Sequence, residues 1–129
     1  ARLAGFGELV GYPDKAEKIP SIGPKVLSRY AQQIFPTAVH SAVHNVLPCF
    51  RALSPDDIPI AGEVPSRPNL FLHTGHGTLG WTCGLSTGDC VAQAIVDRIN
   101  GNDTQNGTFT LHGGTKVSRQ SLSPKRFGG

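Results

Sequence analysis

Apolar residues in this chain fall in short runs between turn residues, and only two segments keep a helical spacing. The first runs from Pro24 to Phe35, with the proline in the first turn, where its missing N–H breaks no hydrogen bond. The second follows Gly80 and continues to about Asn100, and Gly101 is typical of the position just past a helix end. The pattern therefore predicts two helices, of which the second is the longer.

Shorter apolar segments without a helical period predict strands. They cover residues 3–10, 42–53, 58–61 and 70–72. Pro59 places the third of them at a sheet edge, because proline cannot donate to a β-ladder. The chain after residue 102 is polar or rich in glycine, so we expect it to be loosely ordered apart from residues 108–111. Strands and helices together predict an α+β fold.

The segment from Asn69 to Trp81, NLFLHTGHGTLGW, is the most informative part of the chain. A short apolar strand leads through three glycines directly into the long helix. Glycines leave the backbone uncovered where the first amides of a helix point outward, and a helix N-terminus carries partial positive charge. Such a turn suits an anion or the electron-rich edge of a cofactor. We therefore expect it to form the rim of a nucleotide-cofactor site.

Three interpretations of this turn stay open from the residues alone. The spacing Gly75-x-Gly-x-x-Gly80 matches the dinucleotide fingerprint, which also needs a second strand and an acidic residue about 20 residues later. The chain after Gly80 offers a helix and a polar tail, without a convincing second strand. A turn that contacts another part of a cofactor is the favoured interpretation. A purely structural helix entry is the third.

Composition and charge argue against several other classes. The net charge is only +3 and the basic residues are scattered, apart from a loose cluster within residues 116–126, so nucleic-acid binding is not expected. No apolar run approaches the ~20 residues of a membrane span. His73 and His76 with Cys83 or Cys90 can be imagined as zinc ligands. These cysteines lack the close pairing of structural zinc sites, so we expect them to pack in the helix and expect no metal site.

Four segments, in order along the chain, carry a family resemblance. They are AGFGELVG at 4–11, LPCFRALSPDDIPIAG at 47–62, NLFLHTGHGTLGW at 69–81 and LSPKRF at 122–127. Together they resemble the C-terminal part of FAD-dependent D-amino-acid dehydrogenases, in the superfamily of D-amino-acid and glycine oxidases. That family's N-terminal dinucleotide fingerprint precedes the matched part. Since the chain also begins at Ala1 and contains no methionine, we expect a fragment of such an enzyme.

The resemblance implies a partial two-domain flavoprotein. Residues 1–63 would supply antiparallel strands and one helix of the substrate domain. Residues 64–101 would supply the strand, glycine turn and long helix at the C-terminal end of the FAD-binding domain. Residues 102–129 would form a polar tail.

A substrate-binding role for Arg51 follows from the same resemblance, because related amine oxidases place an arginine here to hold the substrate carboxylate. A guanidinium pairs with a carboxylate through two parallel hydrogen bonds, which fixes the position of the α-carbon. The alternative is an arginine on a solvated strand face, paired with Asp56 or Asp57. The family's flanking glycine and proline are Cys49 and Ala52 in this chain, so the local backbone departs from the family pattern.

The glycine turn is implied to contact the pyrimidine side of the flavin through its backbone. The residues concerned are Gly75, His76, Gly77, Thr78, Leu79, Gly80 and Trp81. Reduced flavin gathers negative charge near N1 and O2, which helix-start amides stabilise. A packing turn without a ligand is the alternative. Thr78 stands where some relatives carry a second arginine, which favours the dehydrogenase branch over the glycine-oxidase branch. His73 replaces an asparagine of the family, and packing is its expected role.

The implied activity is oxidation of D-amino acids to imino acids, which hydrolyse to keto acids, by hydride transfer to FAD. The electron acceptor would be a quinone, another carrier or oxygen. The alternatives are a sarcosine, glycine or proline-type amine oxidase of the same superfamily, and a non-catalytic domain that keeps the fold and binds a partner.

This chain alone is expected to be inactive and to bind no FAD, because contacts to the adenosine diphosphate half would be missing. Its partner would be the missing N-terminal part of the enzyme. Without that part we expect self-association through orphaned strand edges and the helix face that bears Val91, Ala94 and Ile95.

Overall fold

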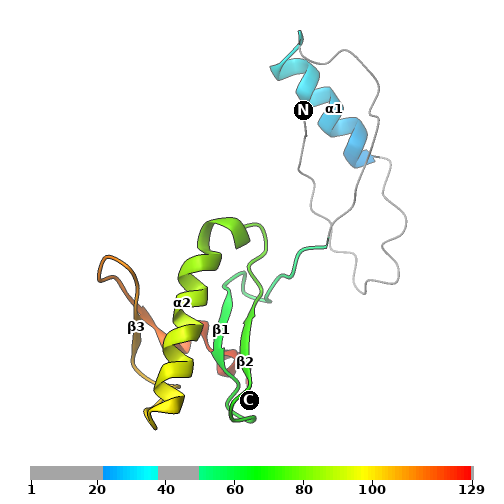
Figure 1. Cartoon of the computed structure of the whole chain (residues 1–129). Coiled ribbons are helices and arrows are strands. Elements are labelled where there is room, and N and C mark those ends of the chain that lie inside the picture. The colour runs from blue at the N-terminus through cyan, green and yellow to red at the C-terminus, as the bar shows by residue number, and fades with distance from the viewer. Residues whose placement is uncertain (1–21, 38–49, 129) are drawn as a thin grey trace. The chain divides into compact units, whose positions relative to one another are not determined.

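The computed structural model describes residues 22–37 and 50–128 (Figure 1). The chain divides into two compact units, Ala1–Phe50 and Arg51–Gly129. The strand expected at residues 3–10 and most of the one expected at 42–53 lie outside the described residues.

In the smaller unit the described element is helix α1, Ile22–Ile34. It confirms the helix predicted from Pro24 to Phe35, with ends that differ by one or two residues. Gly23 and Ala31 are its buried residues.

The larger unit begins with an antiparallel hairpin. Strand β1, Ile60–Glu63, pairs with strand β2, Phe71–Thr74, so that Ile60 lies opposite Thr74 and Glu63 opposite Phe71. The strand expected at 58–61 is therefore displaced toward the C-terminus. The displacement has a local cause, since β1 starts directly after Pro59, which has no N–H to donate.

Helix α2, Gly80–Ile99, packs along this hairpin and confirms the long helix predicted after Gly80 (Figure 1). The glycine turn at its start connects it to β2. Its buried residues contribute to one core, which also receives side chains from β1 and from the C-terminal segment. The core residues are Ala61, Cys90, Ala94, Phe109 and Leu122.

The C-terminal segment is ordered, so the expectation of a loosely ordered tail is wrong, and only the order expected at residues 108–111 is confirmed. It forms strand β3, Thr108–Thr110, strand β4, Lys116–Ser118, helix α3, Arg119–Leu122, and the 3-10 helix η2, Pro124–Phe127. Strands β3 and β4 pair antiparallel, with Phe109 opposite Val117. Two residues of this segment, Phe109 and Leu122, insert into the core, and only Phe109 lies in the part expected to be ordered. These two large side chains anchor the segment, in which Thr104, Arg119 and Ser123 are also buried.

Polar contacts add to this anchoring. The Arg119 guanidinium forms an ion pair with Asp97 of α2 and lies over the Phe109 ring, 4.3 Å from its centroid. The Gln93 side chain bonds the backbone of β3 in the manner of a neighbouring strand. Its Nε2 donates to the Thr110 carbonyl (2.9 Å), and its Oε1 accepts from the Thr110 amide (3.0 Å). Helix α2 thus forms, through the Gln93 side chain, the two backbone hydrogen bonds that a neighbouring strand would make with Thr110 of β3.

Replacing Gln93 by alanine is expected to lower the free energy of unfolding by about 1–2 kcal/mol, because two hydrogen bonds to Thr110 are lost together. Urea unfolding of the chain measures this difference. Gln120→Ala is the matched control, since Gln120 makes a single long contact to Asn106 (3.3 Å) and should change stability by less than about 0.5 kcal/mol. Equal effects of the two substitutions would contradict the bridging role of Gln93.

The helix face expected to drive self-association is partly buried inside the unit. Ala94 belongs to the core and Val91 packs against it, so only Ile95 of the three predicted residues is exposed. The sequence pattern missed this because β1, β2 and β3 pack against the helix. The larger apolar side chains that α2 leaves exposed are Trp81, Leu85, Ile95, Val96 and Ile99.

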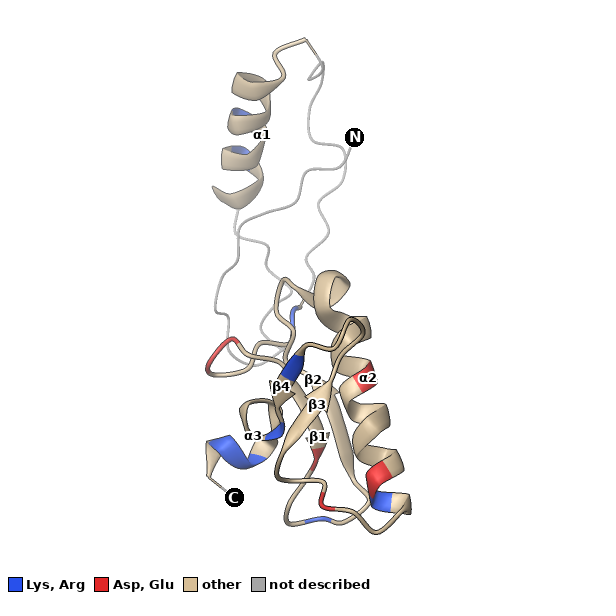
Figure 2. Ribbon diagram, turned by 90° about the vertical axis from the view of Figure 1, so that its left-hand side faces the viewer, with Lys and Arg blue, Asp and Glu red and all other residues tan. Residues whose placement is uncertain are grey.

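Together these elements confirm an α+β fold with small antiparallel sheets. Figure 2 shows that Lys and Arg recur on the C-terminal elements, while the charged residues of α2 are Asp89, Asp97 and Arg98. Among the described helices, none combines the length and apolarity that crossing a membrane requires.

Candidate functional site

The glycine turn lies against the segment that carries Arg51. Leu53 and His76 form an antiparallel bridge, and the Gly77 amide donates to the Ala52 carbonyl over 2.9 Å. The two stretches that the sequence singled out, 25 residues apart between Arg51 and His76, are thus joined by backbone hydrogen bonding. The structure brings the predicted substrate residue and the predicted cofactor turn together.

The close approach of these segments explains two of the glycines. Gly77 has a φ of +53°, and a Cβ on it would lie 2.8 Å from Leu53 Cδ2. Gly75 has a φ of +76°, and its Cβ would lie 3.1 Å from the Cβ of Ser54. The positive φ therefore favours glycine at both positions, and the neighbouring segment leaves little room for a side chain, above all at Gly75 beside the Cβ of Ser54. Gly80 differs, because a Cβ there would meet only His76 Cβ at 3.6 Å, an ordinary contact.

Helix α2 starts without a capping side chain. Leu79 is the N-cap residue and makes no side-chain cap hydrogen bond. The Leu79 amide donates to the His76 carbonyl (2.9 Å), whereas the amides of Thr78, Gly80 and Trp81 donate to no acceptor within the described part of the chain. Unsatisfied amides at a helix start concentrate partial positive charge, so this end of α2 fits an electron-rich group.

Most of this rim is open to solvent. Arg51, Thr78, Leu79 and Gly80 are exposed, and Trp81 is 100% exposed. Gly75 is buried, while His76 and Gly77 are half-buried under the neighbouring segment. The predicted site residues therefore form a surface that is packed against the Arg51 segment at Gly75 to Gly77 and is exposed to solvent from Thr78 to Trp81.

Arg51 forms no ion pair with any carboxylate among residues 22–37 and 50–128. The alternative pairing with Asp56 is already taken, because Arg126 binds that carboxylate through Nε (2.7 Å) and Nη2 (3.1 Å). Arg126 also donates to the Ile58 carbonyl over 2.6 Å. Its hydrogen bonds hold the pKa of Asp56 far below the ordinary value. Among the described residues, then, no carboxylate occupies the guanidinium of Arg51.

Two histidines and a threonine form a cluster behind the turn. Nε2 of His73 and Nε2 of His76 each lie 2.8 Å from Oγ1 of Thr87, and the two rings meet edge to face with centroids 4.7 Å apart. Burial, and secondarily the neighbouring His73, lower the pKa of His76 below its ordinary value. His76 is therefore held as a neutral ring at neutral pH.

The two described cysteines do not extend the site. Cys90 lies in the core, and burial, with a smaller effect of the Asp89 charge, raises the pKa of its thiol. Cys83 is half-buried and donates to the Leu79 carbonyl. Within the described ranges, no three His, Cys, Asp or Glu side chains gather as metal ligands.

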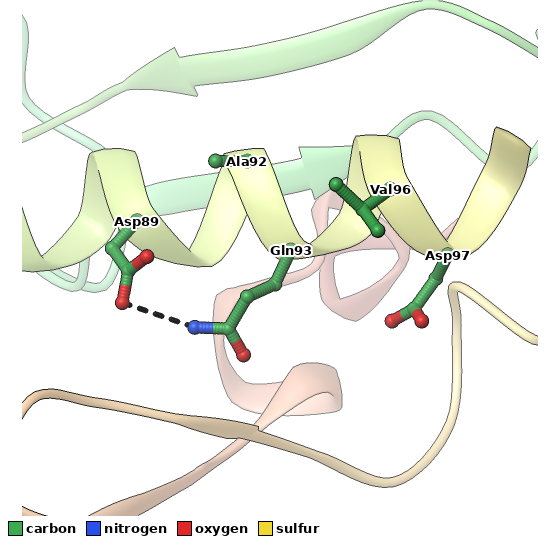
Figure 3. A pocket seen from close by; sticks show the side chains of 5 residues that line it. All are labelled: Asp89, Ala92, Gln93, Val96 and Asp97. Carbon is green, nitrogen blue, oxygen red and sulfur yellow. Dashed lines mark hydrogen bonds between the residues drawn. The ribbon is translucent and has the colours of Figure 1, made fainter.

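A surface pocket on α2 is separate from the glycine turn. It is lined by Asp89, Ala92, Gln93, Val96 and Asp97, and Figure 3 shows the hydrogen bond from Gln93 to Asp89 across it (3.0 Å). Gln93 and Asp97 serve there to bind Thr110 and Arg119 of the C-terminal segment. We assign this pocket to the packing of that segment.

Sequence reasoning missed Thr87 and Arg126 and assigned no specific role to His73. The spacing of His73 and His76 was visible, but nothing in the sequence shows that a helix residue 14 positions after His73 meets both rings. For Arg126 the only signal was its place in the LSPKRF segment, and its partner Asp56 lies 70 residues earlier.

Comparison with known proteins supports the interpretation of these segments. Residues 4–94 match the family model described as FAD dependent oxidoreductase. Two proteins named D-amino acid dehydrogenase, from Vibrio vulnificus strains YJ016 and CMCP6, are each 36% identical to this chain over 101 residues. The matched part is 78% of this chain but 23% of each relative, so the chain spans about a quarter of their length. No solved structure matches the chain.

Proposed function

Because this chain belongs to the FAD dependent oxidoreductase family, we propose that it is the C-terminal part of an enzyme that oxidises D-amino acids. The products would be imino acids, which hydrolyse to keto acids. The electrons would leave through a quinone, another carrier or oxygen. The relatives named D-amino acid dehydrogenase support this choice of substrate, and the resemblance of residues 47–62 and 69–81 to that family agrees with it.

The observation that carries the proposal is the hydrogen-bonded junction between the Arg51 segment and the glycine turn. Gly77 N–H donates to the Ala52 carbonyl, and Leu53 is bridged to His76. The Arg51 guanidinium, which has no carboxylate partner within residues 22–37 and 50–128, and the uncapped start of α2 consequently lie on segments joined by backbone hydrogen bonding. The first suits a substrate carboxylate, and the second suits the negative charge that gathers on a reduced flavin.

Each group has a defined part in this proposal. Arg51 holds the substrate carboxylate and so orients the α-carbon. The amides of Thr78, Gly80 and Trp81 donate toward the pyrimidine edge of the flavin. Bound FAD supplies the acceptor for the hydride. None of these tasks requires a strong base from this chain. His76 contributes as part of the turn and not as a base.

The division into two domains is part of the same proposal. Residues 1–63 are assigned to the substrate domain, 64–101 to the FAD-binding domain and 102–129 to the C-terminal segment. The β1–β2 hairpin crosses the first boundary, since Glu63 and Phe71 are paired. The two domains would therefore share this hairpin as a rigid connection.

The experiment is to purify the full-length protein that contains this chain and to record its visible spectrum. We expect a flavin spectrum that bleaches when a D-amino acid is added without oxygen, and no bleaching with the L-enantiomer. The 129-residue chain titrated with FAD is the control, and we expect no tight binding. A protein without flavin would favour a non-catalytic domain. Bleaching by sarcosine or glycine in place of D-amino acids would favour an amine oxidase.

A further inference from the structure

The hydroxyl of Thr87 has more hydrogen-bond partners than any other side chain behind the glycine turn. Thr87 lies in α2 and is 7% exposed. Its Oγ1 lies 2.8 Å from Nε2 of both His73 and His76, 2.9 Å from the Cys83 carbonyl oxygen and 3.2 Å from the Gly84 carbonyl oxygen. Four polar atoms, from β2, the turn and α2, thus converge on one oxygen.

Counting protons determines which group donates in each contact. A threonine hydroxyl has one proton and two acceptor lone pairs. The Cys83 and Gly84 carbonyls can only accept, so if the hydroxyl proton is directed at them, both imidazoles must donate an Nε2–H to the lone pairs. If the hydroxyl instead donates to one histidine, that ring must carry its proton on Nδ1, and the contacts to both carbonyls are lost. Only the first arrangement satisfies the two histidine contacts and the carbonyl contacts together.

The consequence concerns the turn that connects β2 to α2. His73 belongs to β2, His76 to the turn and Thr87 to the helix, so the shared hydroxyl ties the turn to both flanking elements. The Gly77–Ala52 hydrogen bond ties the same turn to the Arg51 segment. Neighbouring residues of the turn are therefore held from two sides, by a side chain and by the backbone.

We propose that Thr87 is a positioning residue: its single hydroxyl holds His73 and His76 as Nε2–H tautomers and thereby fixes the conformation of the glycine turn. That this turn meets a flavin rests on the proposed function; the positioning itself does not. Under this assignment Nδ1 of His76 is a hydrogen-bond acceptor, so any ligand group placed against it must be a donor.

The test uses the 129-residue chain and nuclear magnetic resonance at pH 8. Long-range ¹H–¹⁵N correlations are expected to show a protonated Nε2 and an unprotonated Nδ1 for His73 and His76. In Thr87→Val, which keeps the side-chain shape, hydrogen exchange of the Gly77 and Leu79 amides should become about tenfold faster. Thr87→Ser should restore slow exchange.

Thr82→Val is the matched control, because Thr82 is an exposed threonine of the same helix. It should leave exchange in the turn unchanged. An Nδ1–H tautomer for either histidine, or unchanged exchange in Thr87→Val, would overturn the proposal. The full-length Thr87→Val protein separates this from the proposed function: if the chain behaves as expected but flavin absorbance is unaffected, the assignment of the turn to flavin fails and the positioning role stands.

Discussion

Replacing Glu63 by glutamine is expected to lower the free energy of unfolding by about 3 kcal/mol, the lower end of the range for breaking a buried ion pair. Glu63 is 2% exposed, and its carboxylate accepts four hydrogen bonds. The donors are Arg98 Nε (2.7 Å), Arg98 Nη2 (2.5 Å), Thr104 Oγ1 (2.5 Å) and the Asn69 amide (2.8 Å). A glutamine would place an NH₂ group against one set of these donors. The Arg98 side chain is 40% exposed and would regain water, which limits the loss.

Urea unfolding of the chain measures this effect, with Asp89→Asn as the matched control. Asp89 is an exposed carboxylate on α2 that accepts one hydrogen bond from Gln93, so its loss should change stability by less than about 1 kcal/mol. A Glu63→Gln variant as stable as the wild type would show that the charge of the Glu63 carboxylate does not stabilise the fold.

Because of Glu63, we expect the free energy of unfolding to fall at acid pH. Burial by itself raises the pKa of Glu63, but the hydrogen bonds from Arg98, Thr104 and the Asn69 amide outweigh it and lower the pKa from 4.5 to about 2. The unfolded chain therefore binds the proton first as the pH falls. The stabilisation is fully present above about pH 4.5 and is lost as the pH falls toward 2. Glu63→Gln should flatten this part of the stability profile.

Arg51→Ala in the full-length protein is expected to weaken D-amino-acid binding by about 2–5 kcal/mol, or roughly 30- to 5,000-fold, while FAD remains bound. The physical reason is that a carboxylate would lose a charged, two-pronged partner. Arg51→Lys should recover only part of the affinity, because an ammonium cannot form the planar pair of hydrogen bonds.

Steady-state kinetics with a D-amino acid and the flavin absorbance of the same samples measure both parts. Inhibition by benzoate should disappear together with substrate affinity. Arg67→Ala, an exposed arginine in the β1–β2 loop, is the matched control and should leave the Michaelis constant unchanged. Ordinary turnover and an unchanged Michaelis constant in Arg51→Ala would make Arg51 a structural residue, and the proposed carboxylate site would have to be abandoned.

Local patterns in the sequence were enough to determine α1, α2 and the apolar strand before the glycine turn. Apolar spacing indicates which face of a helix is buried. Gly101 marks the end of α2 and Pro59 the start of β1, and both effects depend only on the backbone chemistry of the residue itself. The order of strand, glycine turn and helix could be predicted in this way. The role predicted for the glycines at 75, 77 and 80, bare backbone for a ligand, stays a prediction, and the approach of Ser54 to Gly75 and of Leu53 to Gly77 was not visible in the sequence.

The C-terminal segment is a part of the structure that local sequence patterns do not predict. Its strands are three residues long and a single phenylalanine in β3 is buried, so the sequence indicated order only at residues 108–111 and did not reveal β4. Order comes from partners distant in sequence, since Arg119 binds Asp97 and Arg126 binds Asp56. A salt bridge or a side-chain hydrogen bond of this kind leaves no trace in the spacing of apolar residues.

By itself, then, the sequence determined which stretches form the main helices and the glycine turn, and which residues resemble a flavoenzyme site. Only the tertiary structure decided that Glu63 is buried among donors from positions 69, 98 and 104, and that Thr87 joins two histidines. The physical reason is that backbone conformation follows from neighbouring residues, whereas the environment of a polar side chain is set by whichever distant segments the fold places around it.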